Sequence, residues 1–139
     1  MLVDTNAAFL PVRVGFPLEE EVDRECPGAR IAVPTSVVRE LDRLRARGTP
    51  QAEAARAFVD RLPTVAAPGI GDDTLLRTAV RAGAWVVTAD RALRDRLLEA
   101  GVDVLAPRDR HRLERFRPRA RRRTTPSRPP STKVRVGNG

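Results

Sequence analysis

The sequence is poor in several residue types, and each scarcity narrows what the protein can do. Its only cysteine among 139 residues, Cys26, rules out an internal disulfide and is typical of a reducing compartment. Its only histidine, His111, excludes nucleases that use paired histidines and is expected at the surface. Its only lysine, Lys133, is too near the end to serve a phosphate-accepting receiver domain. Aromatic residues make up 4% of the chain, so the core should be aliphatic.

Long apolar runs are also missing. No run approaches the length of a membrane span, and no charged and apolar leader precedes Leu2. We therefore expect a soluble cytoplasmic protein without a membrane partner. A chain of this length corresponds to about one domain, which can bury a core without metal or disulfide staples.

Acidic residues are absent from the last part of the chain. The net charge is +8, and residues 117–139 hold eight basic residues and no acid. The other 18 basic residues equal the 18 acids in number, so residues 1–116 are formally neutral. Arg, Pro, Ser and Thr dominate the end of the chain and leave too little apolar surface for a core. The sequence predicts one domain over 1–116 and a disordered basic tail over 117–139.

Short apolar runs alternate with helical patterns along the domain, which predicts an α/β fold with a parallel sheet and right-handed crossovers. The expected strands cover 2–3, 30–34, 64–67, 84–87 and 102–105. The expected helices cover 18–26, 36–47 with Thr35 or Ser36 as the cap, 51–62, 72–82, 91–100 and 108–116. Pro11, Gly15 and Pro17 break the segment after Asn6, which is expected to be a loop or a short helical piece.

Acidic residues stand at distinctive places in this pattern. Asp4 and Asp90 follow predicted strands, where ligands of open α/β sheets bind. Glu40 lies at the border of the apolar stripe of a predicted helix, and Asp72 and Asp73 lie at the start of another helix. Each acid also has a purely structural explanation, because Asp4 can form a turn, Glu40 can lie on a solvated rim, and the others can cap helices.

Carboxylates gathered at one edge of a sheet would repel one another, and one would have to take up a proton. A divalent cation removes this conflict. Oxygen ligands without histidine or cysteine favour Mg²⁺ or Mn²⁺, which serve enzymes that act on phosphate esters. A dehalogenase-like phosphatase is excluded, because it needs a second aspartate where this chain has Asn6.

The segments that carry these acids, 3–6, 37–44, 72–76 and 87–93, resemble the ordered acidic motifs of PIN-domain ribonucleases. The run 88–101 is especially similar to archaeal VapC-type toxins and to ribosomal-RNA-processing PIN nucleases. The similarity covers residues 1 to about 115. It implies a three-layer α/β/α fold with strand order 3-2-1-4-5, and an Mg²⁺- or Mn²⁺-dependent endonuclease that cuts RNA to leave a 5′-phosphate.

The resemblance also assigns roles to individual residues. The acids that it identifies as catalytic are Asp4, Glu40, Asp73 and Asp90. Asp73 matches the family's third acid better than Asp72 does. The metal ligands would come from the four catalytic acids and Asp72. The polar residues that it makes supports are Thr5, Asn6 and Thr88. In the tail, the arginines expected to bind RNA are Arg119, Arg121, Arg122 and Arg123, because basic groups attract phosphates by counterion release.

The biological role stays open between two enzyme readings. A toxin would have an antitoxin as partner, and an RNA-processing factor would work on a ribosomal particle, which the basic tail favours. A homodimer is compatible with both, but the proline-interrupted segment 7–14 departs from relatives that begin a helix there, which leaves the dimer surface and substrate entry undefined. The alternative outside enzymology is a PIN fold that only binds RNA or assists ribosome assembly.

Overall fold

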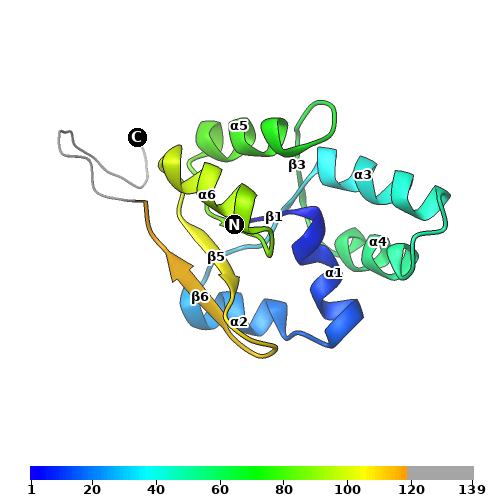
Figure 1. Ribbon diagram of the computed structural model, residues 1–139, viewed down its shortest axis with the longest axis horizontal. Coiled ribbons are helices and arrows are strands. Elements are labelled where there is room, and N and C mark those ends of the chain that lie inside the picture. Colours follow the sequence, from blue (N-terminus) through cyan, green and yellow to red (C-terminus); the bar gives the residue numbers. More distant parts are fainter. Residues whose placement is uncertain (119–139) are drawn as a thin grey trace.

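The computed structural model describes residues 1–118 (Figure 1). Its helices are α1 (Thr5–Val14), α2 (Leu18–Glu25), α3 (Thr35–Ala46), α4 (Ala52–Asp60), α5 (Asp72–Ala82) and α6 (Arg91–Glu99). Its strands are β1 (Leu2–Val3), β2 (Val33–Pro34), β3 (Thr64–Val65), β4 (Val86–Val87), β5 (Val104–Pro107) and β6 (Leu113–Phe116). The sequence predicts disorder over 117–139, and of these residues the structure describes only Arg117 and Pro118. The four arginines expected to bind RNA all lie outside the described residues.

The strands lie in the order that the sequence predicts. β1, β4 and β5 pair in parallel side by side, and β2 pairs in parallel with β3. A parallel bridge between Leu2 and Ala32 joins the two parts, with the Ala32 N–H donating to the Met1 carbonyl at 2.8 Å. The order 3-2-1-4-5 is therefore confirmed, and β6 extends it as an antiparallel edge strand beside β5.

Helices cover both faces of this sheet, because its short strands are apolar on both sides. Successive strand residues point to opposite faces. Leu2, Val86 and Val104 pack with α5 and α6, whereas Val3 and Val87 pack with α1, α2, α3 and α4. All five residues are at most 2% exposed. The three-layer α/β/α architecture follows from this alternation.

Residues 108–116 were expected to be helical, and that prediction is wrong. The chain reverses at Asp109, whose carboxylate accepts hydrogen bonds from the N–H groups of His111 at 2.8 Å and Arg112 at 3.0 Å. β6 then returns along β5 with Leu113 opposite Pro107. The local pattern fits a helix or a strand, and burial of Leu113 against the rest of the core favours the strand.

Of the loop and the short helical piece expected after Asn6, the structure has the helix, which begins at Thr5 and runs for ten residues. Contrary to expectation, Pro11 does not break it but lies inside it and removes one backbone donor. Burial of Phe9 and its neighbours holds this helix in place, and Gly15 ends it in the left-handed conformation with φ of 65°. Neither Thr35 nor Ser36 caps α3; the Thr35 hydroxyl instead donates to the Ala67 carbonyl and accepts from the Ala67 N–H, both at 2.9 Å.

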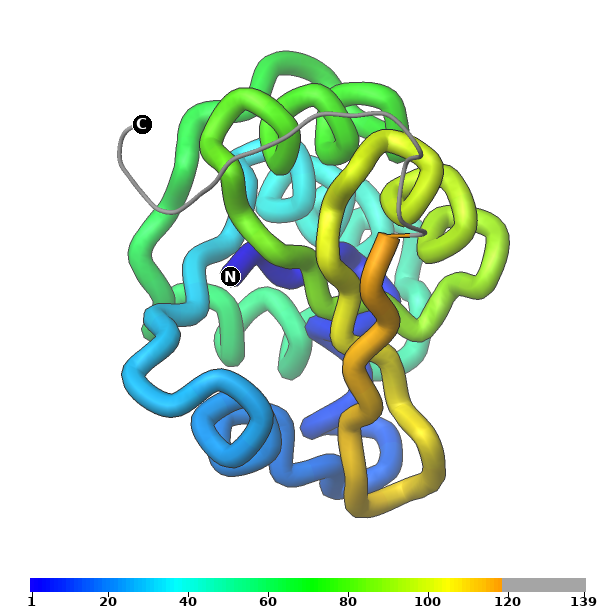
Figure 2. Tube along the Cα trace, turned by 90° about the vertical axis from the view of Figure 1, so that its left-hand side faces the viewer, coloured from blue at the N-terminus to red at the C-terminus, as the bar shows by residue number. Residues whose placement is uncertain are grey.

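The outer edge of β6 is covered by α2 (Figure 2). Glu21, which is 7% exposed, accepts a hydrogen bond from the Leu113 N–H at 2.9 Å. Arg24 donates to Glu21 at 2.8 Å and to the Leu113 carbonyl at 3.1 Å. The Arg24 hydrogen bond, helped by the Leu113 N–H, lowers the pKa of Glu21 against the opposing effect of burial. This pair satisfies edge groups that would otherwise be open to another strand.

No helix among residues 1–118 is long and apolar enough to cross a bilayer.

We predict that Glu21→Ala lowers the free energy of unfolding by about 1–3 kcal/mol at neutral pH, because a buried N–H and a guanidinium lose their acceptor. Urea unfolding measures the change. A lowered pKa means that Glu21 contributes its full stabilisation above its unfolded pKa and loses it as the pH falls through the lower folded value. The difference from wild type should therefore shrink in acid. Glu20→Ala, at an exposed position of the same helix, is the control, and equal losses in both variants would contradict the assignment.

Candidate active site

The candidate site lies where β1 and β4 end side by side. Val3 and Val87 are register partners, so Asp4 and Thr88 leave the sheet together. The Thr88 hydroxyl donates a hydrogen bond to Asp4 Oδ2 and accepts one from the Asp90 N–H at 3.0 Å. One hydroxyl therefore fixes the positions of two acids.

Both strand-following acids also cap helices. Asp4 Oδ1 accepts from the Ala7 N–H at 2.7 Å at the start of α1, and Asp90 Oδ1 accepts from the Leu93 N–H at 3.1 Å at the start of α6. The structural explanation of these acids and the functional one are compatible. Asp90 caps its helix with Oδ1 alone, and each oxygen of Asp4 accepts one hydrogen bond and keeps a lone pair for a further partner.

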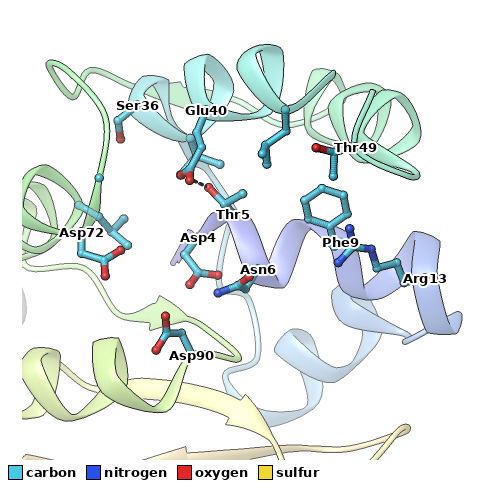
Figure 3. Close-up of a pocket in the computed structure, with 14 residues that line it drawn as sticks. Asp4, Thr5, Asn6, Phe9, Arg13, Ser36, Glu40, Thr49, Asp72 and Asp90 are labelled. Carbon is cyan, nitrogen blue, oxygen red and sulfur yellow. Dashed lines mark hydrogen bonds between the residues drawn. The ribbon is translucent and has the colours of Figure 1, made fainter. Parts of the chain in front are cut away.

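Two further acids reach the same place from other elements. Glu40 comes from the second turn of α3, and Asp72 is the first residue of α5. The two join Asp4 and Asp90 in lining a cavity of about 340 Å³. Figure 3 shows the carboxylates of Asp4, Asp72 and Asp90 around one space, with Glu40 above it. We call this cavity the acidic pocket; its acids are Asp4, Glu40, Asp72 and Asp90.

The adjacent acids Asp72 and Asp73 point in different directions. Asp72 lines the acidic pocket, whereas the Asp73 side chain is 73% exposed and forms an ion pair with Arg96 at 2.5 Å. Hydrogen bonding and attraction by Arg96 lower the pKa of Asp73. Consecutive helical residues are rotated by about 100°, so only one of the two can face the pocket, and the structure places Asp72 there rather than the expected Asp73.

The predicted supports are only partly where they were expected. Thr88 does hold Asp4, as described above. Thr5 is expected to support Asp4, but its hydroxyl donates a hydrogen bond to Glu40 Oε1 at 2.6 Å. Asn6 lines the acidic pocket beside them.

The acids of the pocket disturb one another. Burial, opposed by the hydrogen bonds from Thr88 and Ala7 and reinforced by the charges of Asp72 and Asp90, raises the pKa of Asp4 to about 7. Burial and then the charge of Asp90 raise the pKa of Asp72, against the attraction of Arg96. Burial first, and then mutual repulsion, thus favours the protonated forms of Asp4 and Asp72.

The donor set fits a hard divalent cation. As the side chains stand, no three acidic, histidine or cysteine groups within residues 1–118 form a preassembled cluster around one ion. The pocket nevertheless offers the carboxylate oxygens of four acids. The Ser36 hydroxyl that borders it is 2% exposed without a hydrogen-bond partner among the described residues. A cation would stabilise the ionised carboxylates against both burial, which is the main cause of the raised pKa values, and their mutual repulsion. Oxygen ligands suit Mg²⁺ or Mn²⁺.

Comparison with known proteins agrees with this geometry. A profile of the family described as PIN like domain matches residues 1–110. The chain belongs to the PIN-like domain family. The solved structure of the PIN domain endonuclease Utp24 is similar to this PIN-like chain, with a TM-score of 0.68 and 21% sequence identity over 84% of this chain and 91% of that one. At this identity the similarity establishes the fold alone. No match to the chain is found among curated proteins.

Three residues of the PIN-like site escaped the sequence analysis. Ser36 precedes Glu40 by four residues and so shares its helix face, a spacing that could have revealed it. Phe9 and Arg13 line the same cavity from α1. Their spacing of four residues places them on one face only if a helix continues from Phe9 to Arg13. Pro11 between them argues against such a helix, so the sequence alone does not identify the pair.

We predict that Asp4→Asn stabilises the metal-free protein at alkaline pH. An acid whose folded pKa of about 7 exceeds its reference value of 3.8 binds more protons in the folded state between those values, so its ionisation destabilises the fold as the pH rises. Asparagine removes this penalty and keeps an oxygen for the Ala7 N–H. We expect a gain of about 2–4 kcal/mol at pH values above 7, vanishing near pH 4.

Urea unfolding in the presence of a chelator, repeated across this pH range, checks the gain. Asp95→Asn on the exposed side of α6 is the matched control and should show no such gain. A difference between Asp4→Asn and wild type that does not change with pH would contradict the burial of an ionised group.

Proposed function

We propose that the protein is a divalent-metal-dependent endoribonuclease that hydrolyses phosphodiester bonds of RNA. The observation that carries this proposal is the acidic pocket, where four carboxylates from four separate segments line one cavity at the carboxyl ends of parallel strands. Membership of the PIN-like family and the fold shared with a PIN domain endonuclease support the reaction class. A module that only binds RNA would gain nothing from four carboxylates that repel one another, of which Asp4 is buried.

Each residue of the pocket has a part in this chemistry. Asp4, Asp72 and Asp90 would hold Mg²⁺ or Mn²⁺, which supplies an activated water and stabilises charge on the leaving oxygen. The Thr88 hydroxyl keeps Asp4 and Asp90 in place before any ligand arrives. Glu40 is held through one oxygen by Thr5 and has its other oxygen free to orient the attacking water.

We propose RNA processing in the cytoplasm, with a ribosomal particle as partner, rather than a toxin paired with an antitoxin. The basic segment 117–139, which can attract the phosphates of RNA, supports this choice. Co-sedimentation with ribosomal particles is the measurement that separates the two. A small antitoxin that copurifies with the chain, as a monomer or a homodimer, would favour the toxin instead.

We predict that Asp72→Asn lowers the rate of RNA cleavage by at least about 100-fold, because a metal ligand matters at least as much as the groups that orient it. Asp73→Asn, the matched neighbour, should cut within about twofold of wild type, since it loses only an exposed ion pair. Initial rates on labelled single-stranded RNA with Mg²⁺ or Mn²⁺ measure both.

Melting temperature provides a second readout for the same pair. Mn²⁺ that binds the folded state alone raises stability by mass action. The rise should be similar in wild type and Asp73→Asn and much smaller in Asp72→Asn. If both variants cut RNA as fast as wild type, the activity comes from another site or another protein.

We predict that the basic segment tethers RNA while the acidic pocket cuts it. Truncation after Phe116, where β6 ends, should preserve the fold and weaken binding of RNA. The slope of log affinity against log salt should become shallower by about 0.7 for each phosphate contact that is lost. Replacing Arg119, Arg121, Arg122 and Arg123 together by glutamine should reproduce part of the change in the full-length chain. Unchanged slopes would show that this segment does not contact RNA.

A further inference from the structure

Helix α1 presents a stripe of three side chains, Asn6, Phe9 and Arg13, beside the acidic pocket. Their spacing of three and four residues places them on one face of the helix. All three line the cavity that holds the four acids, and the same three line a second hollow, also of about 340 Å³, together with Ala89 and Asp90. Figure 3 shows Phe9 and Arg13 beyond Asn6, on the side away from Asp72. The stripe therefore runs outward from the acids along both hollows.

Arg13 is held in a fixed orientation at the outer end of this stripe. Its guanidinium carbon lies 3.9 Å from the centroid of the Phe9 ring, and its Nη2 donates to the Pro50 carbonyl at 3.2 Å. Stacking on an aromatic ring and one anchoring hydrogen bond reduce the entropy that the side chain would lose on binding a ligand. Most of its N–H donors remain available.

The charge of Arg13 is not neutralised by the acids nearby. The ion pairs found within residues 1–118 join other arginines, such as Arg61 with Glu19 and Arg96 with Asp73. Arg13 instead borders a cavity with four carboxylates and pairs with none of them. The cavity consequently has an acidic inner end, suited to a cation, and a cationic outer end, suited to an anion.

We propose that Arg13 binds a backbone phosphate of the RNA next to the one that is cleaved, so that the strand follows the face formed by Asn6, Phe9 and Arg13. Asn6 and Arg13 are two turns apart, about 10 Å along the helix axis. This separation places Arg13 beyond the scissile phosphate and within reach of a neighbouring one. The planar fork of a guanidinium matches the geometry of phosphate oxygens. The inference rests on the proposed function, for which it defines where the substrate enters.

Steady-state cleavage of a short single-stranded RNA by Arg13→Gln tests the inference in the full-length protein. We expect KM to rise about tenfold with kcat within about twofold, because the contact holds the strand without touching the reacting atoms. The salt dependence of KM should become shallower by about 0.7, the value for one phosphate contact on a single strand. Arg13→Lys should recover part of the affinity, since it keeps the charge and loses the fork.

Arg61→Gln is the matched control. Arg61 also stacks on a phenylalanine, with its guanidinium 5.3 Å from the Phe58 ring, and lies outside the acidic pocket. Its substitution removes the same charge and should change neither KM nor the salt slope by a comparable amount. Melting temperatures of the three variants show whether any of them is poorly folded.

A substrate change isolates the contact from any effect on folding. RNAs that carry one neutral methylphosphonate at successive linkages beside the cleavage site should bind wild type less well at one position. Arg13→Gln should be insensitive at that position, because the charge and its partner act as a pair.

The outcomes separate the inference from the proposed function. If wild type cuts RNA and Arg13→Gln behaves like Arg61→Gln, the inference is overturned and the nuclease stands. If no cleavage occurs but RNA affinity and its salt slope depend on Arg13, the nuclease fails and the binding path stands. If RNA is neither cut nor bound through Arg13, both fall.

Discussion

The Asp4 carboxylate accepts hydrogen bonds from two elements at once, and the arrangement of the site depends on this. The donors are the Ala7 N–H at the start of α1 and the Thr88 hydroxyl just after β4. Asp4 is 4% exposed, and a buried donor that loses its acceptor costs about 1–3 kcal/mol. The pairing of β1 with β4 and the direction of α1 are therefore linked through one side chain. Thr88 extends the network to the Asp90 N–H, so the second acid is placed by the same contacts.

The hydrophobic pattern of the strands determines where these acids point. Leu2 and Val86 face α5 and α6, and Val3 and Val87 face the opposite layer. A slip of one residue in either strand would exchange the two faces and expose the apolar side chains. The same slip would separate Asp4 from Thr88. Burial of four aliphatic residues thus specifies the geometry of the polar site that begins at the ends of their strands, where the Asp4 N–H donates to the Val87 carbonyl at 3.2 Å.

The parts of the fold that the sequence could predict are those where local pattern and tertiary structure agree. The junctions of strand and acid at Asp4 and Asp90 are examples, because an apolar run that ends in a polar cap is visible in the chain itself. The strand 113–116 could not be predicted in this way. Its local pattern predicts a helix, whereas Leu113 bonds to Glu21, 92 positions away, and packing against α2 and β5 makes it a strand.

The choice between Asp72 and Asp73 shows a second limit of sequence reasoning. The motif permits either residue, and only the direction in which α5 leaves the preceding loop decides which one faces the pocket. Gly71 sets that direction with φ of 110°, a conformation that other residues rarely adopt. Similarly, Pro11 indicates a broken segment, whereas burial of Phe9 outweighs the missing hydrogen bond and continues α1 to Arg13.

The distribution of ion pairs explains why the acidic pocket is both costly and useful. Residues 1–116 contain equal numbers of acids and bases, and many of the acids outside the pocket are paired, as Asp42 is with Arg56 and Asp103 with Arg115. Within the pocket the acids face one another instead, and the pKa of Asp4 rises to about 7. Such an arrangement lowers stability and persists where a function needs it. A cation held by these acids would favour the ionised form of Asp4, and its binding would then offset the free energy by which the ionised acids destabilise the fold.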